Sequence, residues 1–139
     1  MKADRLVVDS NVLISALLSP SDPPRRLPNQ LAEDGSILLF SNETFAELAV
    51  RLAKPKFDAY RTAEQMDAFL DWPAELGEWV EPAFQVEACR DSDDNKFLAV
   101  ALSGEADVLI TGDSDLLLLD PFEGLPILTP AGFLAKQPG

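Results

Sequence analysis

Short runs of apolar residues alternate along this chain with longer stretches in which apolar residues recur every three or four positions. The short runs are rich in Val, Ile and Leu and predict β-strands, whereas the longer stretches predict amphipathic helices. The predicted strands are residues 6–8, 36–40, 79–82, 107–111 and 126–128, of which 79–82 has the weakest pattern. The predicted helices are residues 11–18, 25–34, 42–54, 62–70, 91–103 and 130–135.

Local start and stop signals support these boundaries. Ser41 or Asn42 can cap the helix that follows, and Pro55 ends it. Gly35 stands just after a predicted helix, at the position that favours left-handed backbone geometry. Alternating strands and helices are typical of an α/β fold in which helices cover a parallel sheet. All strand carboxyl ends then lie at one edge of the sheet, where ligand sites form.

The size of the chain favours one domain. Its 139 residues, 47% of them hydrophobic, predict a single domain over 1–139, because two smaller domains would each bury little apolar surface. The first residues run into a strand without a signal-peptide core, and the apolar runs are far shorter than the roughly 20 residues that span a bilayer. We therefore expect a soluble cytoplasmic protein with no membrane partner.

The charge of the chain is strongly negative, at −13, with 24 acidic and 11 basic residues. Such a surface repels nucleic acid at long range, because phosphate contacts normally come from Lys and Arg. Divalent cations bound at an acidic site would reverse the local charge. A basic protein partner is the other kind of ligand that this charge favours.

The chain contains no histidine, and Cys89 is its only cysteine. A Ser-His-Asp triad, a His-Cys zinc site and a histidine general base are therefore excluded, and Cys89 is expected to be an unreactive thiol. Carboxylates without imidazole favour hard cations such as Mg²⁺ or Mn²⁺, which prefer oxygen ligands. That combination indicates metal-dependent phosphoester chemistry.

Two aspartates stand directly after predicted strands. Asp9 follows 6–8 and Asp113 follows 107–111, with Asp115 two residues further on. Asp9 could simply cap a helix, and the stretch from Gly112 to Asp115 could simply form a turn. A strand followed by Asp-x-Asp is also found in phosphatases with an aspartyl nucleophile, although the fifth position is Leu117 here, where Thr or Val is expected. Because both aspartates follow strands, they can meet at the same edge of the sheet.

The stretch Asp91–Asn95 places acids in the first turn of a predicted helix. These acids could simply cap that helix and favour its positive end. The run also imitates a calcium loop, but that match fails at Lys96 and Leu102, where glycine and glutamate are required. Asp94 is the candidate ligand in this stretch.

Glu47 lies on a predicted helix whose apolar stripe consists of Phe45, Leu48, Ala49 and Leu52. At 100° per residue, Glu47 lies about 150° from the centre of this stripe. Periodicity alone therefore predicts a solvated side chain.

Taken together, these stretches resemble the PIN-domain nucleases, especially the VapC-like toxins of bacterial toxin–antitoxin pairs. The matching stretches follow the family's order over nearly the whole chain. They are residues 6–13 (LVVDSNVL), 45–48 (FAEL), 94–101 (DNKFLAVA) and 109–116 (LITGDSDL).

The resemblance implies a three-layer α/β/α fold with a central parallel sheet, and cleavage of RNA at an acidic pocket holding one or two Mg²⁺ or Mn²⁺ ions. The residues that it assigns to catalysis and metal binding are Asp9, Glu47, Asp94 and Asp113, with Asp115 as a candidate fifth acid. Asn11 and Thr111 would support the acids by hydrogen bonds.

The resemblance also implies a small basic antitoxin as partner, with a homodimer as another candidate assembly. Two other functions stay open: a phosphatase or phosphotransfer domain with an aspartyl nucleophile, and a non-enzymatic module whose acids bind basic partners. Candidate phosphate contacts are basic residues that could equally be ordinary surface charges: Arg25, Arg26, Arg51, Lys54, Lys56 and Lys96.

Overall fold

The computed structural model describes residues 5–18, 31, 33–52, 77–82 and 95–135. Within these ranges the strands form one sheet in the order β3-β2-β1-β4-β5, and every neighbouring pair is parallel. The parallel sheet predicted from the alternating pattern is therefore confirmed. The strands are β1 (Arg5–Val8), β2 (Ile37–Phe40), β3 (Gly77–Trp79), β4 (Val108–Ile110) and β5 (Ile127–Leu128).

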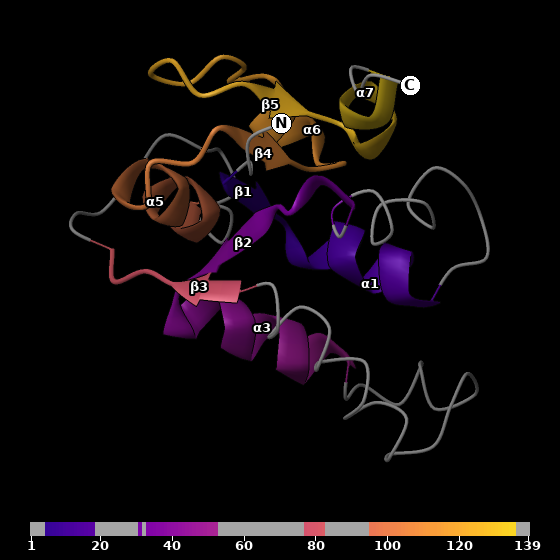
Figure 1. Ribbon diagram of the computed structural model, residues 1–139, viewed down its shortest axis with the longest axis vertical. Coiled ribbons are helices and arrows are strands. Elements are labelled where there is room, and N and C mark those ends of the chain that lie inside the picture. The colour runs from indigo at the N-terminus through magenta and orange to yellow at the C-terminus, as the bar shows by residue number, and fades with distance from the viewer. Residues whose placement is uncertain (1–4, 19–30, 32, 53–76, 83–94, 136–139) are drawn as a thin grey trace.

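Helices cover both faces of this sheet, which gives the three layers of an α/β/α fold. The helices of the described ranges are α1 (Ser10–Leu18), α3 (Asn42–Leu52), α5 (Asn95–Ser103), α6 (Ser114–Leu117) and α7 (Pro130–Ala135). Figure 1 shows α5 on one side of the central strands and α1 and α7 on the other.

Alternate side chains of the strands pack against these two helical layers. On β1, Leu6 and Val8 belong to a core that includes residues of α1, α3 and α7. Val7, between them, belongs to a second core with residues of α5 and α6. Successive side chains of a strand point to opposite faces, so a strand whose residues are all apolar needs cover on both sides. This is why Leu6, Val7 and Val8 form an unbroken apolar run.

Two local signals act as the sequence predicts. Ser41 caps α3: its Oγ accepts a hydrogen bond from the Thr44 N–H at 3.1 Å, and the Thr44 Oγ1 accepts one from the Ser41 N–H at 2.9 Å. This reciprocal pair satisfies N–H groups that the first turn of a helix leaves without partners. Gly35 adopts φ of +68°, the left-handed geometry that glycine tolerates best.

The third strand is displaced from its predicted position. The prediction of 79–82 is wrong, since β3 consists of Gly77–Trp79. Its register is fixed by β2, where Phe40 pairs with Trp79. The Val80 N–H donates the last hydrogen bond of this pairing, to the Phe40 carbonyl at 2.7 Å. Directly after Phe40 the chain turns into α3, so the residues after Val80 have no strand to pair with.

Helix α6 was not predicted, because its four residues are too few to show a periodic pattern. The predicted helix 62–70 and most of the predicted helix 25–34 lie outside the described residues, as do the start of the helix predicted over 91–103 and Cys89. No helix in the part of the chain that the structure describes is long and apolar enough to cross a membrane.

The strand order creates a switch point between β1 and β4. From β1 the chain passes through α1 to β2 on one side, whereas from β4 it passes through α6 to β5 on the other side. In open α/β sheets, a crevice forms at the carboxyl ends of the strands where the connections diverge in this way. Asp9 and Thr111, the residues that directly follow these two strands, are therefore placed at the position where such folds bind ligands.

Candidate active site

Asp9 is nearly buried at the end of β1, with 6% of its surface exposed. Its N–H donates to the Ile110 carbonyl of β4 at 3.0 Å, which extends the pairing of the two strands. Its Oδ1 accepts a hydrogen bond from the Val12 N–H at 2.8 Å, so Asp9 caps α1. The cap uses one carboxylate oxygen and leaves the other facing Thr111.

Thr111 connects the two aspartates. It is fully buried, and its hydroxyl donates to Oδ2 of Asp9 although the two residues are 102 positions apart in the sequence. The same Oγ1 accepts a hydrogen bond from the Asp113 N–H at 3.0 Å. One buried hydroxyl therefore holds the Asp9 carboxylate and the backbone of Asp113 in a fixed relation.

Asp113 is half-buried and caps α6, because its Oδ1 accepts a hydrogen bond from the Asp115 N–H at 2.7 Å. Asp113 and Asp9 line the same pocket of about 420 Å³ at the switch point, and Asp115 is not among its lining residues. The walls of the pocket come from α1, the segment after β4 and the start of α7. Its lining residues are Asp9, Asn11, Val12, Ser15, Gly112, Asp113, Thr129, Pro130 and Ala131.

The electrostatic state of Asp9 is unfavourable without a counter-charge. Burial raises the pKa of Asp9 above its ordinary value of 3.8, although hydrogen bonds from Thr111 and Val12 oppose the rise. The negative charge of Asp113 raises this pKa further, and the positive charge of Arg51 lowers it. The folded protein therefore holds an ionised Asp9 at a free-energy cost, which a cation in the pocket would offset.

This cost predicts a pH-dependent effect of Asp9→Asn on stability. A raised pKa in the folded state means that the stability contributed by protonated Asp9 is lost as the pH rises through that pKa. In EDTA, we expect the melting temperature of Asp9→Asn, relative to that of the unaltered protein, to increase as the pH is raised from about 4 to 7. Thermal melts at several pH values would measure this difference.

The same melts test cation binding. Mg²⁺ or Mn²⁺ should raise the melting temperature of the unaltered protein, because a ligand that binds only the folded state stabilises it. Asp9→Asn should largely remove that rise. An equal rise in both proteins, or a difference between them that does not change with pH, would contradict this description of Asp9.

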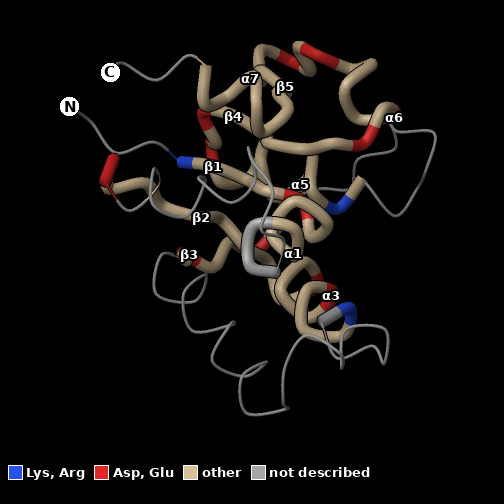
Figure 2. The backbone as a smooth tube through the Cα atoms, turned by 90° about the vertical axis from the view of Figure 1, so that its right-hand side faces the viewer, with Lys and Arg blue, Asp and Glu red and all other residues tan. Residues whose placement is uncertain are grey.

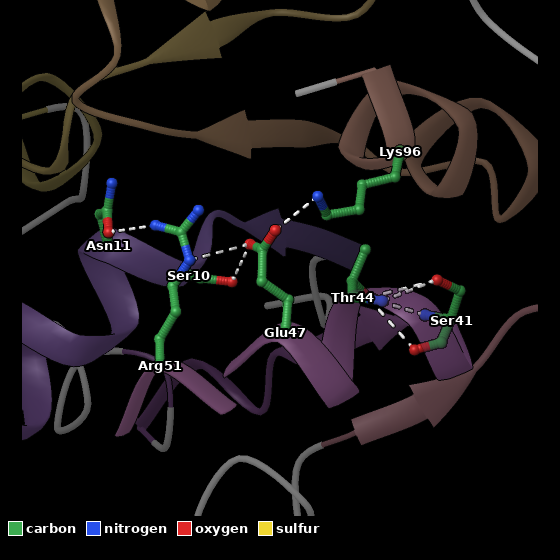
Figure 3. A network of polar contacts seen from close by, with 7 residues as sticks. All are labelled: Ser10, Asn11, Ser41, Thr44, Glu47, Arg51 and Lys96. Atoms are coloured by element: carbon green, nitrogen blue, oxygen red, sulfur yellow. Dashed lines mark hydrogen bonds and ion pairs between the residues drawn. The ribbon is translucent and has the colours of Figure 1, made fainter. Parts of the chain in front are cut away.

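Glu47 is not the solvated residue that helical periodicity predicts. Its side chain is only 16% exposed, and its carboxylate lies between three partners, as Figure 3 shows. Oε1 accepts a hydrogen bond from Oγ of Ser10 at 2.7 Å and lies 3.6 Å from Nε of Arg51. Oε2 forms an ion pair with Nζ of Lys96. The prediction failed because the stripe calculation counts only the face that packs on the sheet, whereas α1 and α5 approach α3 from other directions.

These partners keep Glu47 ionised. Burial alone would raise its pKa, but the hydrogen bonds from Lys96 and Ser10 and the charges of Lys96 and Arg51 outweigh burial and lower the pKa. The carboxylate thus joins three helices, since Ser10 begins α1, Lys96 lies in the first turn of α5, and Glu47 with Arg51 belongs to α3. The spacing of Glu47 and Arg51 is a helical i,i+4 pair that the sequence could have revealed, whereas nothing local indicated Ser10 or Lys96.

The structure brings together only some of the predicted site residues. Asp9 and Asp113 share the pocket, and Asn11 lines it while its Oδ1 accepts a hydrogen bond from Nη1 of Arg51 at 2.8 Å. Asp94 lies outside the described residues, as do Arg25, Arg26, Lys54 and Lys56. Within the described ranges, no three acidic or cysteine side chains gather closely enough to hold a metal ion.

Comparisons with known proteins identify similar chains. The family model of the PIN domain matches residues 5–115. "Uncharacterized protein MJ1680" of Methanocaldococcus jannaschii is 32% identical over 120 residues, which cover 83% of this chain and 74% of that protein. A chain in the crystal structure of VapBC2 from Rickettsia felis, bound to a DNA fragment from their promoter, superposes with a TM-score of 0.58 at 14% identity. That match covers 88% of this chain and 96% of the other, and the likeness is one of fold.

Proposed function

The chain belongs to the PIN-domain family, and from that premise we propose that it is a nuclease that cleaves RNA phosphodiester bonds with Mg²⁺ or Mn²⁺. PIN domains are generally nucleases. The observation that carries the proposal is the pair of aspartates, Asp9 and Asp113, which face one pocket at the switch point of the sheet. Thr111 links them by hydrogen bonds.

The donor set at this pocket fits a hard divalent cation. Asp9 and Asp113 supply carboxylate oxygens, which are the ligands that Mg²⁺ and Mn²⁺ prefer, and the chain has no histidine to attract softer metals. Burial raises the pKa of Asp9, and the hydrogen bonds and the charge of Arg51 offset this rise only in part. Asp94 is a proposed third ligand. When bound, the cation would activate water and neutralise the charge that develops on the phosphate.

The residues of this chain hold the pocket in place. The Thr111 hydroxyl and the Val12 N–H each bind one oxygen of Asp9, so the carboxylate cannot rotate freely. Asp113 is fixed by its bond to the Asp115 N–H. Both aspartates therefore keep their orientation before a ligand arrives, which lowers the entropic cost of binding. The Glu47 carboxylate already contacts Lys96, Arg51 and Ser10. We therefore propose that it supports the site and does not bind the cation directly.

We further propose that a small basic antitoxin binds this protein and blocks the pocket. The Rickettsia felis structure of similar fold is described as VapBC2 bound to promoter DNA. The net charge of −13 suits a basic partner, because complementary charge speeds association. Co-expression of this chain with the product of a short adjacent reading frame, followed by co-purification in high and low salt, would test this partner.

The nuclease proposal is tested by digestion of single-stranded RNA with the purified protein in Mg²⁺, Mn²⁺ or EDTA. We expect cleavage only with a divalent ion. The products should carry 5′-phosphate and 3′-hydroxyl ends, because water rather than the ribose 2′-hydroxyl attacks. A 2′,3′-cyclic phosphate would contradict the proposed route, and so would cleavage in EDTA. Covalent trapping of phosphate on an aspartate would instead support the phosphatase function.

A further inference from the structure

Arg51 contacts a residue that lines the pocket of Asp9 and Asp113. Its Nη1 donates to Oδ1 of Asn11 at 2.8 Å, and Asn11 is itself a lining residue of that pocket. Its Nε lies 3.6 Å from Oε1 of Glu47. Figure 3 shows the guanidinium between Asn11 and Glu47, so two neighbours hold the side chain in one place.

The two cations that contact Glu47 differ in their access to solvent and to the pocket. The Arg51 side chain is 35% exposed and contacts Asn11, whereas the Lys96 side chain is 12% exposed and lies on the other side of Glu47. The structure therefore assigns different roles to them. Lys96 neutralises Glu47 within the protein, and Arg51 can meet a ligand.

A guanidinium suits a phosphate ligand. It carries five N–H donors in a rigid plane that matches two oxygens of a phosphate, which is more donors than Asn11 and Glu47 use. Because both neighbours already restrain it, little side-chain entropy remains to be lost when a phosphate binds. Charge-assisted hydrogen bonds of this kind are among the strongest that proteins form.

An RNA strand that binds near Asp9 and Asp113 has a negatively charged backbone, so it needs positively charged side chains nearby. In the described part of the chain the basic residues are Arg5, Arg51 and Lys96, and Figure 2 shows them far outnumbered by acidic positions. Arg5 begins β1, at the opposite end of that strand from Asp9, and pairs there with Glu78 at 2.6 Å. Of these three basic residues, Arg51 is therefore the one that hydrogen-bonds to a lining residue of the pocket.

We propose that Arg51 and Asn11 form a phosphate subsite, which binds a backbone phosphate of the RNA strand whose scissile bond enters the pocket of Asp9 and Asp113. The inference rests on the proposed nuclease function. Glu47 acts there as a positioning residue, because it holds Nε of Arg51 and thereby directs the rest of the guanidinium toward Asn11.

The test is the binding of a 5′-fluorescein single-stranded RNA by fluorescence anisotropy, in EDTA so that cleavage is suppressed. We expect Arg51→Gln to weaken binding about tenfold, as the loss of one charge-assisted contact implies. The slope of log K against log salt should decrease in magnitude by about 0.7, the value for one phosphate on a single strand. Arg51→Lys should be intermediate, because it keeps the charge and loses the planar fork.

Arg5→Gln is the matched control, because it changes the net charge equally at the far end of β1. We expect it to bind RNA within twofold of the unaltered protein, with the same salt slope. A thermal melt of each variant ensures that it is folded at the assay temperature. Absence of RNA binding by the unaltered protein, or equal effects of Arg51→Gln and Arg5→Gln, would overturn the subsite.

Cleavage assays distinguish failure of the subsite from failure of the nuclease function. If Arg51→Gln weakens binding but no divalent ion supports cleavage, the subsite stands and the nuclease proposal is wrong. If the protein cleaves RNA and Arg51→Gln changes neither binding nor KM, the nuclease proposal stands and the subsite is wrong. If both hold, Arg51→Gln should raise KM more than it lowers kcat, because Arg51 binds a phosphate away from the reacting atoms.

Discussion

Replacing Asp9 with Asn should reduce divalent-ion-dependent RNA cleavage by about a hundredfold to a thousandfold, which corresponds to several kcal/mol of lost transition-state stabilisation. Asn is nearly the same size as Asp and can still accept the hydrogen bond from the Val12 N–H that begins α1. The substitution therefore removes a negative charge from the pocket while α1 keeps its cap. Initial rates on a single-stranded RNA, measured with saturating Mn²⁺, would give the ratio.

The control for this experiment is Asp107→Asn. Asp107 precedes β4, whereas Asp113 follows it, so the two lie at opposite ends of this strand. The Asp107 carboxylate accepts a hydrogen bond from the Arg5 N–H at 2.9 Å. The same change of charge there should leave cleavage within twofold. Equal losses in both variants would mean that overall charge, rather than the pocket, governs activity. Full activity of Asp9→Asn would remove the basis for a cation at this site.

Replacing Glu47 with Gln should lower the free energy of unfolding by about 1–3 kcal/mol, since it removes the negative charge that pairs with the poorly solvated Lys96 ammonium. The Lys96 side chain is only 12% exposed, so water cannot fully replace the lost partner. The contacts of Glu47 also hold α1, α3 and α5 together. Urea unfolding at neutral pH would measure the change.

Glu43→Gln provides the comparison for Glu47, because Glu43 lies one turn earlier on α3 and is exposed. Substitutions at such surface positions usually change stability by less than about 0.5 kcal/mol. Adding Lys96→Met to Glu47→Gln should recover part of the loss, because it removes a poorly solvated ammonium that no longer has the Glu47 carboxylate beside it. A Glu47→Gln protein of unchanged stability but without cleavage activity would show instead that Glu47 binds the cation, as the family resemblance implies.

Local sequence signals account for most of the sheet and for the starts of α3 and α7. The apolar run Leu6-Val7-Val8 predicted a strand buried on both faces, and β1 is such a strand. The helix over 130–135 was predicted at the residues where α7 lies. These predictions succeeded because strand burial, helix capping and glycine geometry depend on residues that are neighbours in the chain.

Pairing between distant segments accounts for the predictions that failed. The bounds of β3 depend on where β2 ends, which the residues around Trp79 do not encode. The surroundings of Glu47 depend on Ser10 and Lys96, which reach it from two other helices. Helical periodicity predicts which side chains face the apolar side of their own helix. It does not predict contacts with other helices that pack against the remaining sides.

Local sequence patterns predicted that Asp9 and Asp113 would follow strands of a parallel sheet, because short apolar runs and the residues that close them are local properties. Three features became visible only in the folded chain: β1 and β4 are neighbours, the buried Thr111 hydroxyl joins the two aspartates, and Lys96 and Arg51 contact Glu47. The physical reason is that strand order and the burial of a charge follow from the packing of the whole core. No stretch of a few residues contains that information.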